Sequence, residues 1–465
     1  MNIAALAPFL ALSMALPLVA QESPSSEPTV VAAKPVQQAF DAALQQVLKS
    51  QSEDLYAVAL AVLDAGGSEV DFFRLMKQAA DAGMPVAQKW LAQYVLQSAV
   101  EPAIDLSTAP NAIAARRLMK QAADAGYVPA QVEMARYVGS GVGAAADEAE
   151  GMQYLMRACA AGSRRGRAAY LLLSGRLDGG KFDAPETASE LQKGNFHLEE
   201  VIASMYGEMP ESEEWLQKAM EHGSPVAPLL LAQRSSAEND SLKLLRLSAE
   251  RHQPEALAAY GAILLSPSAS SGVERNTSEG IRHLQLAVML GNVSATSTLA
   301  AQYMNNPDTY SAGRVFDLYN IATVLQDPRA SVAYAYCLVC GRGCSPEPEK
   351  GVAMLRQLAD AGSPYAHVAL ADLYFNGTGV EPDMFAAINH LGEAGTIGVP
   401  NTYAIMAAMT QMGNAKARPD ERRAELYLLM AEEQGQTSAR EVYNGIIARK
   451  NWSFLPPAPT STPSS

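Results

Sequence analysis

The chain has 465 residues, of which 48% are hydrophobic and 18% charged, and its formal net charge is −14. The apolar content excludes a globally disordered chain. The acidic balance, without a block of Lys and Arg, excludes a typical nucleic-acid-binding protein, which needs clustered positive charge to release counterions. Because the length exceeds what one compact core usually holds, we expect several domains or a repeat array.

An apolar segment at the N-terminus predicts export. Ile3 to Leu18 forms an apolar run, and Ala20 then precedes a polar stretch. A short hydrophobic segment that ends at a small residue is typical of a cleaved signal peptide, here residues 1–20. The protein is then expected in the periplasm or outside the cell, or in the ER lumen of a eukaryote; a retained anchor is the alternative. No later segment reaches about 18 uninterrupted apolar residues, so no stable membrane span is expected after cleavage.

A linker and a long repeat array are predicted to follow. Residues 21–36 are rich in Ser, Pro, Glu and Val, as in flexible linkers. Farther along, the phrase Leu-Met-Lys-Gln-Ala-Ala-Asp-Ala-Gly ends at Gly83 and recurs unchanged at Gly126. Most copies lie about 36 residues apart, the length of one helical hairpin, and we place the array at 37–452. Degraded copies end at Gly162, Gly223, Gly291, Gly362, Gly395 and Gly435, and His252 and Gln326 occupy the glycine position in two more.

Three positions around each of these glycines repeat a helix-packing pattern. The residues seven before and eight after the glycine are always large and apolar or aromatic, and the residue four after it is Ala in eight of ten copies, with Gly166 and Val399 as the exceptions. The small residue allows two helices to approach, and the large one fills the adjacent groove. Glycine ends the preceding helix, because it adopts the left-handed conformation without a Cβ penalty. The pattern predicts a sharp turn between successive hairpins.

The interval between Gly162 and Gly223 departs from this spacing. It contains Lys193-Gly194-Asn195 but no complete copy of the phrase. We therefore expect an insertion or a badly degraded repeat there, with an irregular stretch at about 175–210 that bends the array.

Three of the four cysteines are close in sequence. Cys337 falls at an inward helix position and is predicted to be a core residue, whereas Cys340 and Cys344 fall in the turn between two helices. Cys340 and Cys344 can close a small disulfide in an oxidising compartment. Free thiols are one alternative, and a metal site, with His367 as the tempting fourth ligand, is another.

The end of the chain predicts a disordered tail. Residues 453–465 are rich in Pro, Ser and Thr, a composition that does not form a packed core. A polyproline ligand is the alternative reading of this tail.

With these repeats the chain resembles the Sel-1-like repeat family, a relative of the tetratricopeptide repeat. The resemblance covers about residues 40–450 and implies an all-α solenoid, a right-handed superhelix of about ten to eleven antiparallel helix pairs with a concave groove. Family members are generally adaptors that assemble protein complexes in bacterial envelopes or the secretory pathway, so the resemblance implies other proteins as partners. The copy most similar to the family pattern contains Ala366, Leu370, Tyr374, Gly377, Gly379, Val380, Asp383, Ala387 and Gly395.

No catalytic, cofactor or metal motif stands out. The glycine turns at 139–143 and 377–380 lack the Gly-Lys-Ser/Thr of a phosphate-binding loop, and the histidines show no His-Glu-x-x-His pattern. A Gly-x-Ser-x-Gly nucleophile elbow is also missing. We expect no cofactor, no metal and no enzymatic activity, and predict an exported scaffold that binds proteins or peptides in its groove. A cell-envelope protein that binds or hydrolyses peptidoglycan or glycans is the alternative, motivated by the unassigned interval after Gly162.

Overall fold

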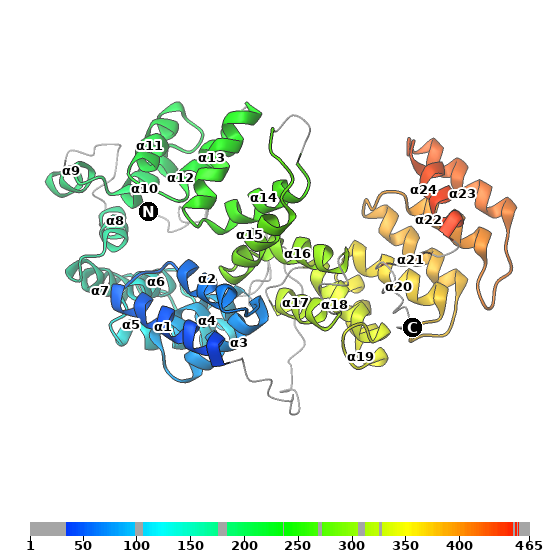
Figure 1. Cartoon of the computed structure of the whole chain (residues 1–465), viewed down its shortest axis with the longest axis horizontal. Helices are drawn as coiled ribbons and strands as arrows, with labels where there is room; N and C mark the ends of the chain where they lie inside the picture. Colours follow the sequence, from blue (N-terminus) through cyan, green and yellow to red (C-terminus); the bar gives the residue numbers. More distant parts are fainter. Residues whose placement is uncertain are drawn as a thin grey trace. The chain divides into compact units, whose positions relative to one another are not determined.

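The computed structural model describes residues 34–97, 106–174, 184–235, 237–267, 272–305, 312–324 and 328–449, together with Trp452 and Phe454. These ranges contain 24 α-helices and no strand (Figure 1), which confirms the predicted all-α class. The first helix begins at Lys34, inside the predicted linker. The predicted signal peptide, the linker up to residue 33 and nearly all of the tail lie outside the described residues.

The chain divides into two units within α16, and among the described residues the first ends at Leu299 and the second begins at Ala300. The helices up to this division are α1 (Lys34–Ser50), α2 (Tyr56–Asp64), α3 (Glu69–Asp81), α4 (Pro85–Gln97), α5 (Pro110–Asp124), α6 (Val128–Gly139), α7 (Glu148–Ala160), α8 (Arg164–Leu173), α9 (Pro185–Gln192), α10 (Phe196–Tyr206), α11 (Pro210–Glu221), α12 (Ala227–Arg234), α13 (Glu238–Glu250), α14 (Pro254–Leu265), α15 (Thr277–Met289) and α16 (Val293–Asn305). The second unit continues with α17 (Ala312–Val324), α18 (Pro328–Cys340), α19 (Pro348–Asp360), α20 (Pro364–Asn376), α21 (Met384–Thr396), α22 (Thr402–Met412), α23 (Glu421–Glu433) and α24 (Ala439–Arg449).

Within each unit, consecutive helices pack as hairpins and the even-numbered helices also contact one another. In the first unit α4 contacts α6, α6 contacts α8, and α8 contacts α10; in the second, α18 contacts α20 and α22 contacts α24. Stacked hairpins of this kind bury a continuous core between neighbours. We call the surface formed by the even-numbered helices α4–α14 in the first unit, and α18–α22 in the second, the inner face.

The first unit closes on itself. Helix α15 packs against α2 and α3, near the start of the unit (Figure 1). Arg282 on α15 forms an ion pair with Asp64 at the end of α2. Gln285, one turn farther along α15, donates a hydrogen bond to Glu69 Oε2 at 3.3 Å. These contacts bring residues more than 200 positions apart in sequence together.

The repeated glycines form the predicted turns between hairpins. At Gly162, with φ of +85°, the backbone N–H donates to Cys159 O at 2.9 Å, and the next N–H, of Ser163, donates to Ala158 O at 3.0 Å. These two bonds satisfy carbonyls at the end of α7, which otherwise lack partners. Only a residue that tolerates positive φ fits the position, and His252 adopts φ of +67° at the same place in its repeat.

One predicted turn glycine is wrong. Gly395 lies inside α21, and the turn is made by Gly398, whose φ is +107°. Gly398 N–H donates to Gly395 O, and Val399 N–H donates to Ala394 O. Two glycines in one short segment misplaced the repeat by three residues. With Gly398 as the reference, the small residue four positions later is the buried Thr402 instead of Val399.

The small-residue column has the burial that the pattern predicts. The alanines four residues after the turn glycines, such as Ala87, Ala130 and Ala366, are fully buried. Gly166 replaces Ala in one repeat because a Cβ there would lie 2.9 Å from the Cβ of Ala158 on the neighbouring helix. Close approach of the helix backbones therefore explains this column, including one of its exceptions.

The interval after Gly162 contains a repeat hairpin. Gly194 adopts φ of +62°, its N–H donates to Leu191 O, and Asn195 N–H donates to Glu190 O, the same two bonds as at Gly162. Helices α9 and α10 flank this turn. Residues 184–223 thus keep the turn geometry of the other repeats although their sequence has diverged, and the predicted irregular stretch at about 175–210 stays a prediction.

Candidate binding surface

The inner face of the first unit holds a non-helical turn of the same chain, residues 51–55, which links α1 to α2. The Tyr127 hydroxyl donates to the backbone carbonyl of Ser52. The backbone N–H of Val128, at the start of α6, donates to Gln51 Oε1 at 2.8 Å. The side chains of Glu53 and Asp54 extend this contact to two more helical hairpins, described next.

Arg165 and His252 contact the carboxylates of this turn. Arg165 on α8 forms an ion pair with Glu53. His252, in the turn before α14, places Nδ1 2.9 Å from Asp54 Oδ2, and its ring stacks on Tyr56 with ring centroids 3.6 Å apart and an interplanar angle of 3°. Residues from distant repeats thus converge on one short turn, which fits the inner side of a curved array.

A buried charge cluster lies beneath the turn. Glu133 on α6 is 4% exposed and accepts hydrogen bonds from Arg165 Nη2 at 2.7 Å and from Arg136 Nε at 3.0 Å. Burial alone would raise the pKa of Glu133, but Arg165, Arg136 and Lys89 outweigh it and lower this pKa to about 2. Burial lowers the pKa of Lys89, and the nearby Glu53 and Glu133 oppose that shift. The acidic and basic groups of the cluster therefore stabilise one another's charged forms against the cost of burial.

The inner face of the second unit has a different centre, the buried carboxylate of Asp372 on α20. Asp372 is 1% exposed and accepts hydrogen bonds from the Tyr336 hydroxyl of α18 and from Asn376 Nδ2, the latter at 2.6 Å. It also accepts the backbone N–H of Phe454, which lies beyond the last helix. Burial raises the pKa of Asp372, and these donors act against that shift without reversing it.

Two aromatic side chains from the C-terminal end of the chain cover this carboxylate. The ring centroid of Phe454 lies 5.4 Å from that of Tyr336. Trp452 and Phe454, both partly buried, pack against an apolar cluster that α20, α21 and α22 build from residues such as Val368, Leu391 and Met406. Phe454 belongs to the predicted tail and Trp452 is the last residue of the predicted array, yet both aromatic side chains lie against the helices.

A histidine pair lies on α20 and α21. The Nδ1 atoms of His367 and His390 are 3.1 Å apart, a distance at which one ring must donate and the other accept. Burial, His367 and Arg356 lower the pKa of His390. His390 also stacks on Tyr374, with an interplanar angle of 14°.

We expect this pair to make the second unit sensitive to mild acid. Because the folded state holds His390 at a lowered pKa, the unfolded state binds more protons, so the free energy of unfolding falls as pH drops from about 7 to 5. His390→Phe, which keeps a ring beside Tyr374, should flatten that dependence in thermal unfolding followed by circular dichroism. His283→Gln, a histidine of the first unit, should leave it unchanged. An unaltered slope in the His390 variant would contradict the assignment.

The cysteines carry free thiols in this structure. Cys337 is 3% exposed, as expected for an inward helix position, and burial raises its pKa to about 12. Cys344 donates a weak hydrogen bond to Cys337 O, with Sγ and O 3.6 Å apart. The Cys340–Cys344 disulfide stays a prediction. Across the described ranges no three His, Cys, Asp or Glu side chains are placed to hold a metal ion, and the hydrogen-bond partner of His367 is His390.

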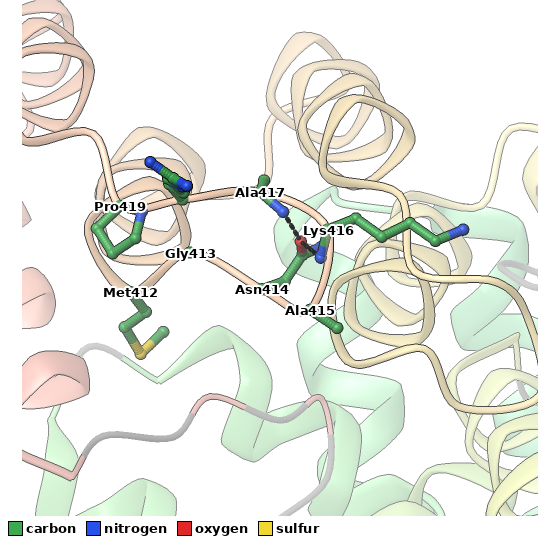
Figure 2. Close-up of a pocket in the computed structure, with 8 residues that line it drawn as sticks. Met412, Gly413, Asn414, Ala415, Lys416, Ala417 and Pro419 are labelled. Carbon is green, nitrogen blue, oxygen red and sulfur yellow. Dashed lines mark hydrogen bonds between the residues drawn. The ribbon is translucent and has the colours of Figure 1, made fainter.

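The loop between α22 and α23 forms a small pocket from its own residues, 412–419 (Figure 2). Asn414 Oδ1 accepts the backbone N–H groups of Lys416 at 3.0 Å and Ala417 at 2.8 Å. These bonds, with φ of +67° at Gly413, stabilise a tight turn. Apart from Met412 at the end of α22, the lining residues belong to this loop, so we do not include the pocket in the candidate surface.

The family model for the Sel1 repeat matches residues 105–127, 128–163, 254–292, 328–363, 364–398 and 403–436. The chain therefore contains Sel1 repeats, the repeat that its sequence resembles. One matched repeat ends at residue 398, in agreement with the turn that Gly398 forms. Sel1 repeats are typically scaffolds for interactions between proteins. The family assignment therefore confirms the predicted resemblance and the solenoid architecture.

Similar proteins come from several bacteria. An uncharacterised protein of Neisseria meningitidis serogroup B is 25% identical over 234 residues, which are 49% of this chain and 41% of that protein, so the match spans less than half of the relative. A protective antigen of uropathogenic Escherichia coli with an SLR fold is 18% identical, with 91% and 92% of the two chains covered and a TM-score of 0.43. A Sel1 repeat protein of Oxalobacter formigenes is 23% identical, with 50% and 99% covered and a TM-score of 0.39.

Sequence reasoning missed the residues that form both inner-face contacts. Asp372 had a detectable signal, because it is a carboxylate inside the otherwise apolar segment Ala369 to Leu373. Burying a carboxylate is costly unless donors surround it, so such a residue marks a specific contact. Glu133 and Arg165 had no comparable signal, since charged residues are common on exposed helix faces. Among the described residues no helix is long and apolar enough to cross a membrane.

Proposed function

We propose that this Sel1-repeat protein is a non-enzymatic adaptor that binds extended segments of partner proteins on its inner faces. One observation supports this function: in each unit an irregular segment of the chain itself lies on even-numbered helices. These segments are residues 51–55 in the first unit and the segment of Trp452 and Phe454 in the second.

In both units the helices bind main-chain atoms of the irregular segment. Tyr127 donates to the carbonyl of Ser52, and Asp372 accepts the N–H of Phe454. Main-chain contacts provide affinity that does not depend on sequence, and neighbouring side-chain contacts add specificity. For the first unit these are the side chains of Arg165 and His252; for the second they are aromatic and aliphatic groups.

The alternative, an envelope protein that binds or hydrolyses peptidoglycan or glycans, was motivated by the unassigned interval after Gly162. The turn at Gly194 in that interval has the same two backbone hydrogen bonds as the turn at Gly162, which favours the adaptor. We further propose that the adaptor acts after export, outside the cytoplasm; the apolar run from Ile3 to Leu18 supports this.

Peptide selection tests the adaptor function. We expect the full chain to enrich 12-residue peptides from a random display library, and these to bind in fluorescence anisotropy. Hydrogen exchange should then show protection concentrated on α6, α8 and α14, or on α18, α20 and α22, because these helices form the inner faces. Protection confined to odd-numbered helices such as α13 and α19, or no enrichment at all, would contradict the proposal.

A further inference from the structure

The chain segment that lies at Asp372 indicates which kind of ligand this site would bind. Helix α24 ends at Arg449, and within a few residues the chain has returned to α18 and α20. The two residues that make this contact, Trp452 and Phe454, are both aromatic and are separated by a single position. Side chains two positions apart in an extended segment point to the same side of the chain. A segment with this spacing can therefore place two rings on one apolar surface.

The protein contacts both the ring and the backbone of Phe454. The ring lies beside Tyr336, while the N–H next to it donates to Asp372. The other donors to this carboxylate, Tyr336 and Asn376, come from the helices and remain when the segment leaves. The N–H of the segment supplies the remaining contact, and any extended peptide can provide the same group.

The contact of Trp452 and Phe454 with the helices resembles that of a bound peptide more than that of core residues. Trp452 and Phe454 are only partly buried, whereas the residues beneath them, such as Leu391 and Met409, are fully buried. The fully buried residues of this cluster come from α20, α21 and α22, and the two rings pack on its outside. Loss of this contact exposes an apolar surface with a buried acceptor beside it, which is the usual composition of a peptide-binding site.

Resting on the proposed adaptor function, we propose that the inner face of the second unit binds extended peptides with two aromatic side chains two positions apart. The chain's own Trp452 and Phe454 are then the built-in occupants, and a partner must displace them. Because the segment is tethered to α24, its effective concentration at the site is of millimolar order. The tethered segment therefore outcompetes partners that bind the free site with micromolar affinity, unless these partners are abundant or are themselves tethered.

A labelled peptide provides the test. The probe is a fluorescein-labelled synthetic peptide with the sequence of residues 449–460, and the protein is the full chain carrying W452A and F454A together. We expect saturable binding to this variant in fluorescence anisotropy, and binding at least tenfold weaker to the wild-type chain. The same peptide with both aromatic residues replaced by Ala should not bind.

The control variant carries L426A and L429A. These leucines are 59% and 45% exposed on α23, so the change removes two large apolar side chains from the same unit and leaves the segment in place. It should bind the probe as weakly as the wild type. Equal binding to the wild type and to the W452A/F454A chain, or no binding to a W452A/F454A chain that unfolds like the wild type, would overturn the proposal.

A measurement on the wild type keeps the proposal testable if the double variant does not fold. With 5-fluorotryptophan in the chain, excess unlabelled peptide should shift the fluorine resonance of Trp452 and leave those of Trp90 and Trp215 unchanged. A Trp452 resonance that does not respond would overturn the displacement. If the W452A/F454A chain instead selects library peptides without aromatic pairs, the ligand class is wrong and the adaptor function stands; if no chain selects any peptide, the adaptor function itself is wrong.

Discussion

Glu133→Gln is expected to destabilise the first unit by about 3–5 kcal/mol, the typical cost of removing one partner from a buried charge pair. Glu133 is 4% exposed and accepts hydrogen bonds from Arg165 and Arg136, with Lys89 close by. Glutamine preserves the shape of the side chain but not its charge. The substitution takes this carboxylate away from the buried Lys89, which is why the expected loss is large; Arg165 keeps its ion pair with Glu53.

The same substitution should change the response to acid. Since the folded state lowers the pKa of Glu133 from 4.5 to about 2, the unfolded state binds the proton more readily between these values. The contribution of Glu133 is therefore present above pH 5 and is lost as pH falls toward 2. We expect the difference in stability between wild type and variant to be largest at neutral pH and to shrink below pH 5.

Urea unfolding at pH 7 and pH 4, with hydrogen exchange of α6 and α8 as the local readout, checks both expectations. The matched control is Asp240→Asn on α13, whose ion pair with Lys243 is exposed, with 65% and 78% of the two side chains accessible. Such surface pairs contribute less than about 1 kcal/mol, so the control should unfold like the wild type. If the Glu133 variant is as stable as this control, the positive charges of the cluster do not need the Glu133 carboxylate, and the prediction is wrong.

The repeat architecture was predictable because it depends on short-range rules. A turn glycine, a small residue and a large residue at set spacings are enough to specify a helical hairpin and its contact with the next one. Those rules located the turns at Gly83, Gly126 and Gly162. They misplaced one turn where Gly395 and Gly398 compete, because the choice between two glycines depends on which one leaves a small residue at the helix contact.

The candidate binding surface was not predictable in the same way. His252 contacts Asp54, and Arg282 contacts Asp64, across roughly 200 positions. Such pairs depend on the accumulated curvature of many repeats, and no local pattern encodes that curvature. Phe454 was assigned to the tail for a related reason: its partners, Tyr336 and Asp372, belong to hairpins about 80 to 120 residues earlier, and the Pro-rich composition after it obscured the contact.

A second packing rule becomes visible only in the structure. Gly151, Gly280 and Gly351 lie inside helices, each against a backbone carbonyl of the preceding helix, at Ala135, Gly261 and Ala335 respectively. A Cβ added at Gly351 would lie 2.5 Å from the Ala335 oxygen and 2.6 Å from Val339 Cγ2. Neither α18 nor α19 can shift cheaply at this point, because the backbone itself is the obstacle.

We therefore expect Gly351→Ala to destabilise the second unit by about 1–3 kcal/mol, the usual cost of overpacking, although alanine is the better helix former. Gly445→Ala provides the opposite case in the same unit: this helical glycine has nothing within 4 Å of the added Cβ. Its substitution should raise stability by about 0.5–1 kcal/mol through helix propensity alone.

The two glycine variants together separate contact from propensity. Thermal unfolding by circular dichroism should shift their midpoints in opposite directions relative to the wild type. Equal stabilisation of both would mean that α18 and α19 do not approach as closely as their backbones indicate, and the hairpin stacking that positions Tyr336 beside Asp372 would have to be looser than the hydrogen bond between them requires. Opposite shifts would instead mean that α18 and α19 approach closely, as the position of Tyr336 beside Asp372 requires.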